Sequence, residues 1–168
     1  SYYEFHTSFK LSRNNDSVVC FCDPTGKVLD RVPVPSNLPT DNSYGRSLGY
    51  AGFYYYYTPT PGTANGIGYY GYVSTPSFSI SGGEYTGTVD VSINIPEGTI
   101  VYYTTDGSIP TQEDTLYTEG EVLTFSRVTP LRARAFDPDG FLQSSATVTQ
   151  TYFVNVYHAF SIVSIVSF

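Results

Sequence analysis

The chain has 168 residues, enough for one large β-domain or two small ones, and its 17 tyrosines and 11 phenylalanines can supply a core although only 40% of the residues are hydrophobic. The net charge of -7, with eight basic residues spread along the chain, excludes a nucleic-acid-binding surface, which needs clustered lysines and arginines. No apolar run approaches the roughly 20 residues of a membrane span, so no span is expected. The low charged fraction of 14% is typical of a secreted β-protein and predicts an extracellular or cell-surface location.

The first half of the chain predicts short strands joined by turns. Glycine and proline interrupt the sequence about every ten residues, and no long apolar period of 3.6 residues is present. The strands are expected at Phe9 to Leu11, Ser17 to Cys22, Lys27 to Val32 and Phe53 to Thr58. The segment Asp23-Pro24-Thr25-Gly26 predicts a tight turn, because proline presets φ and glycine accepts a positive φ. A long irregular segment is expected from Pro33 to Gly52.

The only cysteines, Cys20 and Cys22, lie two residues apart in an apolar run. In a strand both side chains point to one face, where the geometry of a disulfide between them would be strained. A metal site would need further soft ligands, and His6 and His158 lie near opposite ends of the chain. The sequence therefore predicts two reduced cysteines that are buried as small hydrophobic side chains.

The second half of the chain has a repeated strand-and-turn pattern. From Val101 to Pro110 a strand is followed by an Asp106-Gly107 turn, without a nucleophile, a ligand cluster or a phosphate-binding loop. Further strands are expected at Phe78 to Ile80, Gly87 to Ile95, Thr99 to Thr104, Leu116 to Thr118, Val122 to Phe125, Thr129 to Phe136 and Ala146 to Phe153. Short strands at this spacing predict a β-sandwich of the immunoglobulin or fibronectin type III kind.

The predicted fold class is thus all-β, with two immunoglobulin- or fibronectin-III-like β-sandwich modules in tandem. An uncharged stretch rich in glycine and tyrosine, Gly62 to Pro76, indicates the domain boundary. We expect modules at residues 1–66 and 77–156, a linker at 67–76, and the start of a following segment at 157–168. Because the chain begins with Ser1 and contains no methionine, we expect it to be part of a longer protein.

Several motifs of the second module occur in the order and spacing of a known family. They are Thr99 to Pro110, Leu116 to Thr118, Leu131 to Phe136 and Thr149 to Tyr152. With these motifs the module resembles the chitobiase/β-hexosaminidase C-terminal domain family, a small sandwich appended to many bacterial surface and secreted proteins. The resemblance implies an accessory domain without catalytic residues. The segment Asp137-Pro138-Asp139-Gly140 departs from the family, where a shorter basic turn is usual.

Motifs of the first module resemble a second family. They are His6 to Leu11, Asp23 to Gly26 with Asp30, Ser43 to Arg46, and Thr58 to Gly66. These residues resemble the C-terminal half of a lamin tail domain, an immunoglobulin-like fold also found in bacterial extracellular proteins. The opening strands of that family, with their Asn-Glu motif, are missing, so the module is expected to be N-terminally incomplete and to have an unpaired sheet edge.

The order of the two modules is similar to the region upstream of spore-coat-protein-H-type kinase domains. The ending His158 to Val166 resembles the opening strand of such a domain. Catalytic residues of a kinase would lie beyond Phe168, so the resemblance implies none in this chain.

Carboxylates and histidines give few candidates for chemistry. Asp137 and Asp139 are candidate Ca²⁺ ligands, although Asp-Pro-Asp-Gly also forms a good turn without an ion. The pair Glu113 and Asp114 is adjacent on a loop, which is poor geometry for acid and base catalysis. No nucleophile motif accompanies His6 or His158, and Asp106 is expected to serve its turn. We therefore expect no catalytic residue and no cofactor.

Tyrosines are the candidates for a ligand-binding surface, because aromatic faces stack on sugar rings. Alternation in the strand from Phe53 places Tyr55 and Tyr57 on the core face and leaves Tyr54 and Tyr56 pointing outward. The ligand-binding candidates are Tyr54, Tyr56, Tyr69 and Tyr70. The alternative is that the tyrosines pack the modules together, and the absence of tryptophan favours this alternative.

The sequence favours a non-catalytic accessory, spacer or protein-interaction region of a secreted or cell-surface bacterial multidomain protein. Its expected partners are other domains of the parent protein, and cell-wall or dietary glycan is a further candidate. Two alternatives stay open. The chain could be a carbohydrate-binding module that uses exposed tyrosines, or the N-terminal part of a spore-coat-type kinase.

Overall fold

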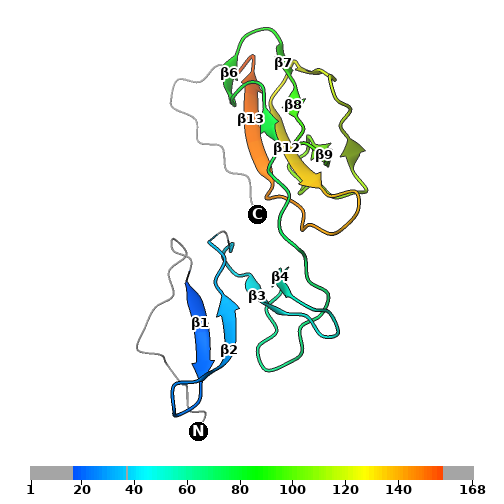
Figure 1. The fold of residues 1–168 in the computed structure, drawn as a ribbon. Helices are drawn as coiled ribbons and strands as arrows, with labels where there is room; N and C mark the ends of the chain where they lie inside the picture. The colour runs from blue at the N-terminus through cyan, green and yellow to red at the C-terminus, as the bar shows by residue number, and fades with distance from the viewer. Residues whose placement is uncertain (1–16, 37, 157–168) are drawn as a thin grey trace. The chain divides into compact units, whose positions relative to one another are not determined.

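The computed structural model describes residues 17–36 and 38–156, and this part of the chain is all-β, as predicted. The chain divides into two compact units, residues 1–70 and 71–168 (Figure 1). In the described part of the chain, no helix is long and apolar enough to cross a membrane. The predicted strand at Phe9 to Leu11 and the segment 157–168 lie outside the described residues.

The described residues of the first unit form two antiparallel hairpins. β1 (Val18–Cys22) pairs with β2 (Val28–Pro33), and β3 (Ser43–Arg46) pairs with β4 (Phe53–Tyr56) (Figure 1). The β1–β2 turn forms where the sequence predicts it, with Gly26 at a φ of 87°. There the Asp23 carboxylate accepts hydrogen bonds from the backbone N–H groups of Thr25 and Lys27 at 2.9 and 3.0 Å. The prediction that the chain is irregular from Pro33 to Gly52 is wrong in part, because β3 lies within this range.

The predicted burial of Cys20 and Cys22 is wrong, because both cysteines are free and exposed. Every residue of β1 is exposed, including Phe21 at 68% of its surface. The physical reason is that β1 and β2 form a two-stranded sheet, and alternation buries a side chain only where a second layer covers its face.

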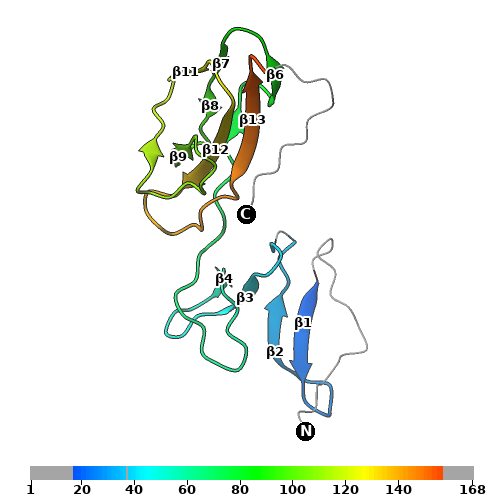
Figure 2. The same cartoon turned by 180° about the vertical axis from the view of Figure 1, so that it is seen from behind.

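The second unit is a sandwich built on a five-stranded sheet with the order β10-β9-β12-β13-β6. Its strands are β5 (Ser77–Phe78), β6 (Gly83–Tyr85), β7 (Val89–Val91), β8 (Ile93–Asn94), β9 (Ile100–Thr104), β10 (Thr115–Leu116), β11 (Leu123–Phe125), β12 (Thr129–Phe136) and β13 (Val148–Val154). β12 is central and pairs antiparallel with β9 and β13, whereas β6 joins β13 in parallel (Figure 2). The strand β6 is not predicted by the sequence.

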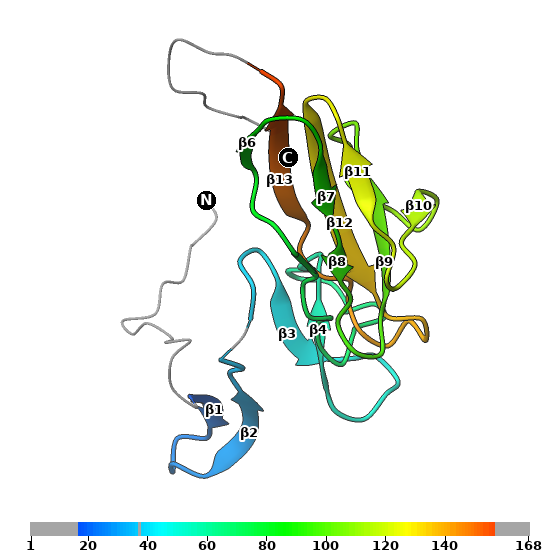
Figure 3. The same ribbon diagram turned by 90° about the horizontal axis from the view of Figure 1, so that it is seen from above.

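Among the described residues of the second unit, one hydrophobic core lies between the large sheet and the shorter strands. β11 pairs with β7 and β5 pairs with β8. β7, β8 and β11 lie near β9 and β12 in Figure 3. Alternation along β12 sends Leu131, Ala133 and Ala135 into the core, each fully buried. They meet apolar residues of the shorter strands, such as Val91 and Phe125. The second unit therefore has the hydrophobic face-to-face packing that stabilises a sandwich.

Polar side chains tie the loops of the second unit to its strands. The Tyr117 hydroxyl donates to the Glu121 carbonyl oxygen and accepts the Ile93 N–H at 3.0 Å. The Tyr152 hydroxyl donates to the Ile80 carbonyl oxygen at 2.8 Å. Arg132, only 1% exposed, donates from Nη1 to the Gly107 carbonyl oxygen at 2.7 Å and so anchors the Asp-Gly turn to β12.

Candidate functional site

The inward and outward faces of β4 are the reverse of those predicted. Tyr54 and Tyr56 are buried, at 8% and 4% exposure, whereas Phe53 and Tyr55 are half-buried and Tyr57 is exposed. The prediction that Tyr54 and Tyr56 point outward is therefore wrong. The physical reason is that residues 65–70 cross this face of the hairpin, and Gly68 allows a close approach. A Cβ at Gly68 would lie 2.5 Å from the Tyr54 Cβ.

The two remaining tyrosine candidates lie on the segment that covers Tyr54 and Tyr56. Tyr69 and Tyr55 exchange backbone N–H···O hydrogen bonds of 2.9 Å in both directions, and the Tyr69 side chain is half-buried. Tyr70 is 64% exposed, and its ring lies 5.1 Å from that of Tyr54 between centroids. A hydrogen bond with the Tyr70 side chain is the main cause that raises the pKa of Tyr54. The four candidates thus do not form one exposed platform.

The opposite face of the β3–β4 hairpin carries a second aromatic cluster. Tyr44 stacks on Phe53 with ring centroids 5.7 Å apart and also contacts the Tyr55 ring at 4.9 Å. The Arg46 guanidinium lies 4.8 Å from the centre of the Phe53 ring. Its two terminal nitrogens also donate to the two carboxylate oxygens of Asp30, and this bidentate ion pair lowers the pKa of Asp30. Arg46 thus holds this face of β3–β4 to β2.

The candidate Ca²⁺ ligands lie in a turn that the backbone itself satisfies. The Asp137 carboxylate accepts the N–H groups of Asp139, Phe141 and Leu142 at 3.1, 2.8 and 2.8 Å. The hydrogen bond from Leu142 is the largest of the causes that lower the pKa of Asp137. The Asp139 side chain is exposed. Among the described residues, no three His, Cys, Asp or Glu side chains form a group that could hold a metal ion.

Other carboxylates that the sequence singles out also serve turns. Asp106 accepts the Ser108 hydroxyl at 2.6 Å and the Ser108 N–H at 2.9 Å, and these bonds lower its pKa. Asp114 accepts the hydroxyl and the N–H of Thr111 at 2.8 and 2.7 Å, while Glu113 is exposed. These are the short-range turns that aspartate forms with its own backbone.

The candidates His6 and His158 lie outside the described residues.

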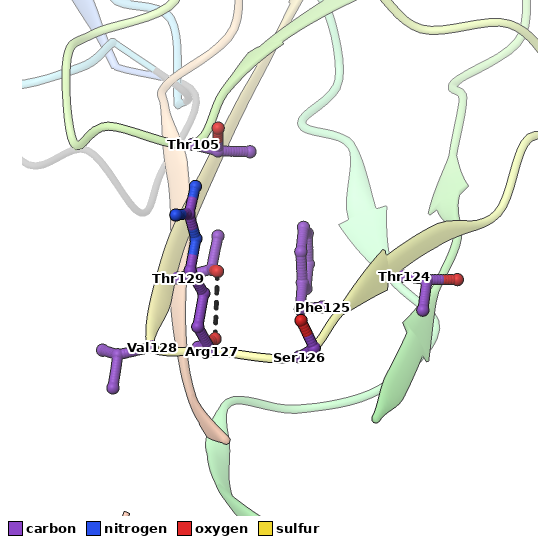
Figure 4. Close-up of a pocket in the computed structure, with 7 residues that line it drawn as sticks. All are labelled: Thr105, Thr124, Phe125, Ser126, Arg127, Val128 and Thr129. Atoms are coloured by element: carbon purple, nitrogen blue, oxygen red, sulfur yellow. Dashed lines mark hydrogen bonds between the residues drawn. The ribbon is translucent and has the colours of Figure 1, made fainter. Parts of the chain in front are cut away.

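The second unit contains a pocket of about 420 Å³ (Figure 4). None of the candidate residues named from the sequence lines it. It is lined by Thr105, which follows β9, and by residues 124–129, which end β11 and begin β12. The Arg127 side chain extends toward Thr105, and the Phe125 ring lies on the other side of the pocket (Figure 4). One sequence signal could have found this site. Arg127 is a single basic residue in the short turn between two predicted strands.

The side chains of Thr129 and Asn155 form hydrogen bonds with the backbone of the turn that carries Arg127. The Thr129 hydroxyl donates to the Arg127 carbonyl oxygen at 3.1 Å. The Asn155 side-chain amide donates to the carbonyl oxygens of Ser126 and Gly87 at 3.3 and 2.9 Å, and the Asn155 Oδ1 accepts the Gly87 N–H at 2.7 Å. Asn155 makes these contacts from a φ of 57°, a left-handed conformation that asparagine tolerates better than most residues. The turn that lines the pocket is therefore hydrogen-bonded to Asn155, the residue that follows β13.

Comparison with known proteins gives a match in the second unit. Residues 80–149 match the family model of the Chitobiase/beta-hexosaminidase C-terminal domain. This confirms the resemblance of the second module. The lamin tail resemblance and the arrangement found upstream of kinase domains are not confirmed. Searches of curated proteins and of solved structures found no match. Residues 80–149 are therefore similar to the Chitobiase/beta-hexosaminidase C-terminal domain, a non-catalytic accessory domain with an immunoglobulin-like fold.

Proposed function

We propose that the chain is a non-catalytic accessory region, a spacer or protein-interaction segment, of a secreted or cell-surface bacterial multidomain protein. Its partners are other domains of that protein. The match over residues 80–149 supports this role, because domains of this type typically occur in extracellular glycosidases. The low charged fraction of 14% is in keeping with an extracellular location.

One observation carries the proposal: Asp137, which the sequence offers as a Ca²⁺ ligand, holds a turn, as do Asp23 and Asp106. Asp23, Asp106 and Asp137 each accept backbone N–H groups, and these bonds lower the pKa of all three carboxyl groups. A general acid needs the opposite shift, a raised pKa that keeps the proton near neutral pH. These three carboxylates therefore stabilise the turns that they belong to.

The first unit supports the lamin-tail-like assignment through bonds between the matched segments. The Asn65 amide donates to the Arg46 carbonyl oxygen at 2.7 Å and its Oδ1 accepts the Thr60 hydroxyl at 2.8 Å. Arg46 is also ion-paired with Asp30. The segments around Asp30, Arg46 and Asn65 thus form one bonded set. We propose that the first unit is the C-terminal half of a lamin-tail-like domain.

We expect the purified chain to show no turnover of ATP or of chromogenic glycosides above the background of the buffer. The physical reason is that Asp106 and Asp137 are engaged by hydrogen bonds within their own turns, and that no three described His, Cys, Asp or Glu side chains form a group that could hold a metal ion. Variants Asp137→Asn and Asp106→Asn serve as matched controls, and their rates should equal that of the unchanged chain. Measurable turnover that is lost on substitution of one of the chain's own residues would contradict the proposal.

A further inference from the structure

We propose that the pocket around Arg127 binds a sugar residue that carries a carboxylate. The pocket combines one cation with several hydroxyl groups: Arg127 and the side chains of Thr105, Ser126 and Thr129 line it. Within the described part of the chain, the structure records no hydrogen bond to the Arg127 guanidinium or to the hydroxyls of Thr105 and Ser126. These groups are therefore available to a ligand.

The charge of the ligand follows from Arg127 and its surroundings. A planar guanidinium recognises carboxylate and phosphate groups through paired hydrogen bonds. Two acidic side chains lie close to the pocket lining: Asp90 accepts the Thr124 hydroxyl at 2.7 Å, and Asp106 follows Thr105 in the chain. The chain as a whole has a net charge of -7. A singly charged carboxylate is repelled less by these groups than a phosphate dianion, so the pocket favours the carboxylate.

The remainder of the lining favours a ligand rich in hydroxyl groups. Ser126 and Thr105 can each donate and accept a hydrogen bond, as sugar hydroxyls do. The Phe125 ring, which is 9% exposed, adds a small apolar area to the lining that the C–H groups of a sugar ring can contact. The volume of about 420 Å³ lies in the range of small-molecule pockets. An acidic monosaccharide therefore matches the pocket in charge, polarity and size.

The site is also held in place before a ligand arrives. Asn155 bonds the Ser126 carbonyl oxygen to the β6–β7 turn at Gly87, and Thr129 bonds the Arg127 carbonyl oxygen. The Phe125 ring packs on the buried Tyr152 ring with centroids 5.5 Å apart. Rigid supports of this kind lower the entropic cost of binding. The Arg127 backbone therefore needs no rearrangement to present its side chain.

The test is a titration of the isotope-labelled chain with glucuronate, followed by the backbone amide resonances. We expect saturable shifts at Thr105 and at residues 124–129, with a dissociation constant of about 1 mM, as for a small and polar ligand. Arg127→Gln should weaken binding at least about tenfold, the effect of losing a charged hydrogen bond. Arg31→Gln is the matched control, because it removes the same charge from an exposed position in the first unit and should leave binding unchanged.

Three further probes decide the chemical class. Glucose lacks the carboxylate, acetate lacks the ring, and inorganic phosphate has a different anion. Each should bind at least about tenfold more weakly than glucuronate. The proposal is overturned if glucuronate causes no saturable shift, if any of the three probes binds as tightly, or if Arg127→Gln binds normally. Turnover by the chain would contradict the accessory role but not the binding of an acidic sugar at this pocket. A titration without saturable shifts would contradict only the binding of the sugar.

Discussion

Replacing Tyr152 by alanine is expected to lower the free energy of unfolding of the second unit by about 3–5 kcal/mol, as for other large buried aromatics truncated to alanine. Tyr152 is fully buried on β13, and its ring contacts those of Phe125 and Tyr85 with centroids 5.5 and 6.1 Å apart. Burial raises the pKa of Tyr152 to about 12. Denaturant unfolding of the chain and the variant measures the difference.

The matched control for Tyr152→Ala is Tyr152→Phe, which keeps the ring and removes the hydroxyl. It loses the hydrogen bond to the Ile80 carbonyl oxygen and should cost about 1 kcal/mol. Comparing the free energies of unfolding of the two variants tests how much the packing of the Tyr152 ring stabilises the core. A Tyr152→Ala variant that is no less stable than Tyr152→Phe would contradict the central place of Tyr152 in the sandwich.

The second large effect is expected at Tyr56 in the first unit. Tyr56 is 4% exposed, so Tyr56→Ala should destabilise the first unit by about 3–5 kcal/mol. Its hydroxyl is buried and has no hydrogen-bond partner among the described residues. Since an unsatisfied buried hydroxyl is unfavourable, Tyr56→Phe should be at least as stable as the unchanged chain. Thermal unfolding followed by circular dichroism measures both variants.

Tyr57→Ala is the control for this series, because Tyr57 is the next residue and is 66% exposed. Its substitution should change stability by less than about 0.5 kcal/mol. If Tyr57→Ala were more damaging than Tyr56→Ala, β4 would face in the sense that the sequence predicted. If the chain binds a glycan, and Tyr56→Ala abolishes this binding without lowering stability, the result would instead support the tyrosine-based carbohydrate site.

Local chemistry was predictable from the sequence, because its causes lie within a few residues. Aspartate and glycine at turns form bonds with their own backbone, so the turns at Asp23, Asp106 and Asp137 follow from the sequence. The strand β12, Thr129–Phe136, matches the predicted bounds because its alternating apolar residues face a complete core.

The remaining features depend on contacts between distant segments. Alternation shows that Tyr54 and Tyr56 share a face, but the buried face is decided by the segment at Gly68 that crosses it. The exposure of Cys20 likewise depends on whether a second layer covers β1, and none does among the described residues; no local pattern reports this. The pocket joins Thr105 to the turn at Arg127, residues that no motif connects. Sequence reasoning therefore predicts turns and strands better than it predicts faces and pockets.

The accessory role is tested most directly by an NMR titration of the aspartate and glutamate side-chain carboxyl groups, with and without Ca²⁺. Asp23, Asp106 and Asp137 should titrate below the ordinary value of 3.8, since hydrogen bonds lower the pKa of each. Because these pKa values are lower in the folded state, the stability that the carboxylates contribute is present above pH 3.8 and is lost as the pH falls through the folded values. Ca²⁺ should move none of the three. A described carboxyl group that titrates near neutral pH, or a Ca²⁺-dependent shift at Asp137 and Asp139, would contradict the accessory role and indicate a catalytic or metal-binding site.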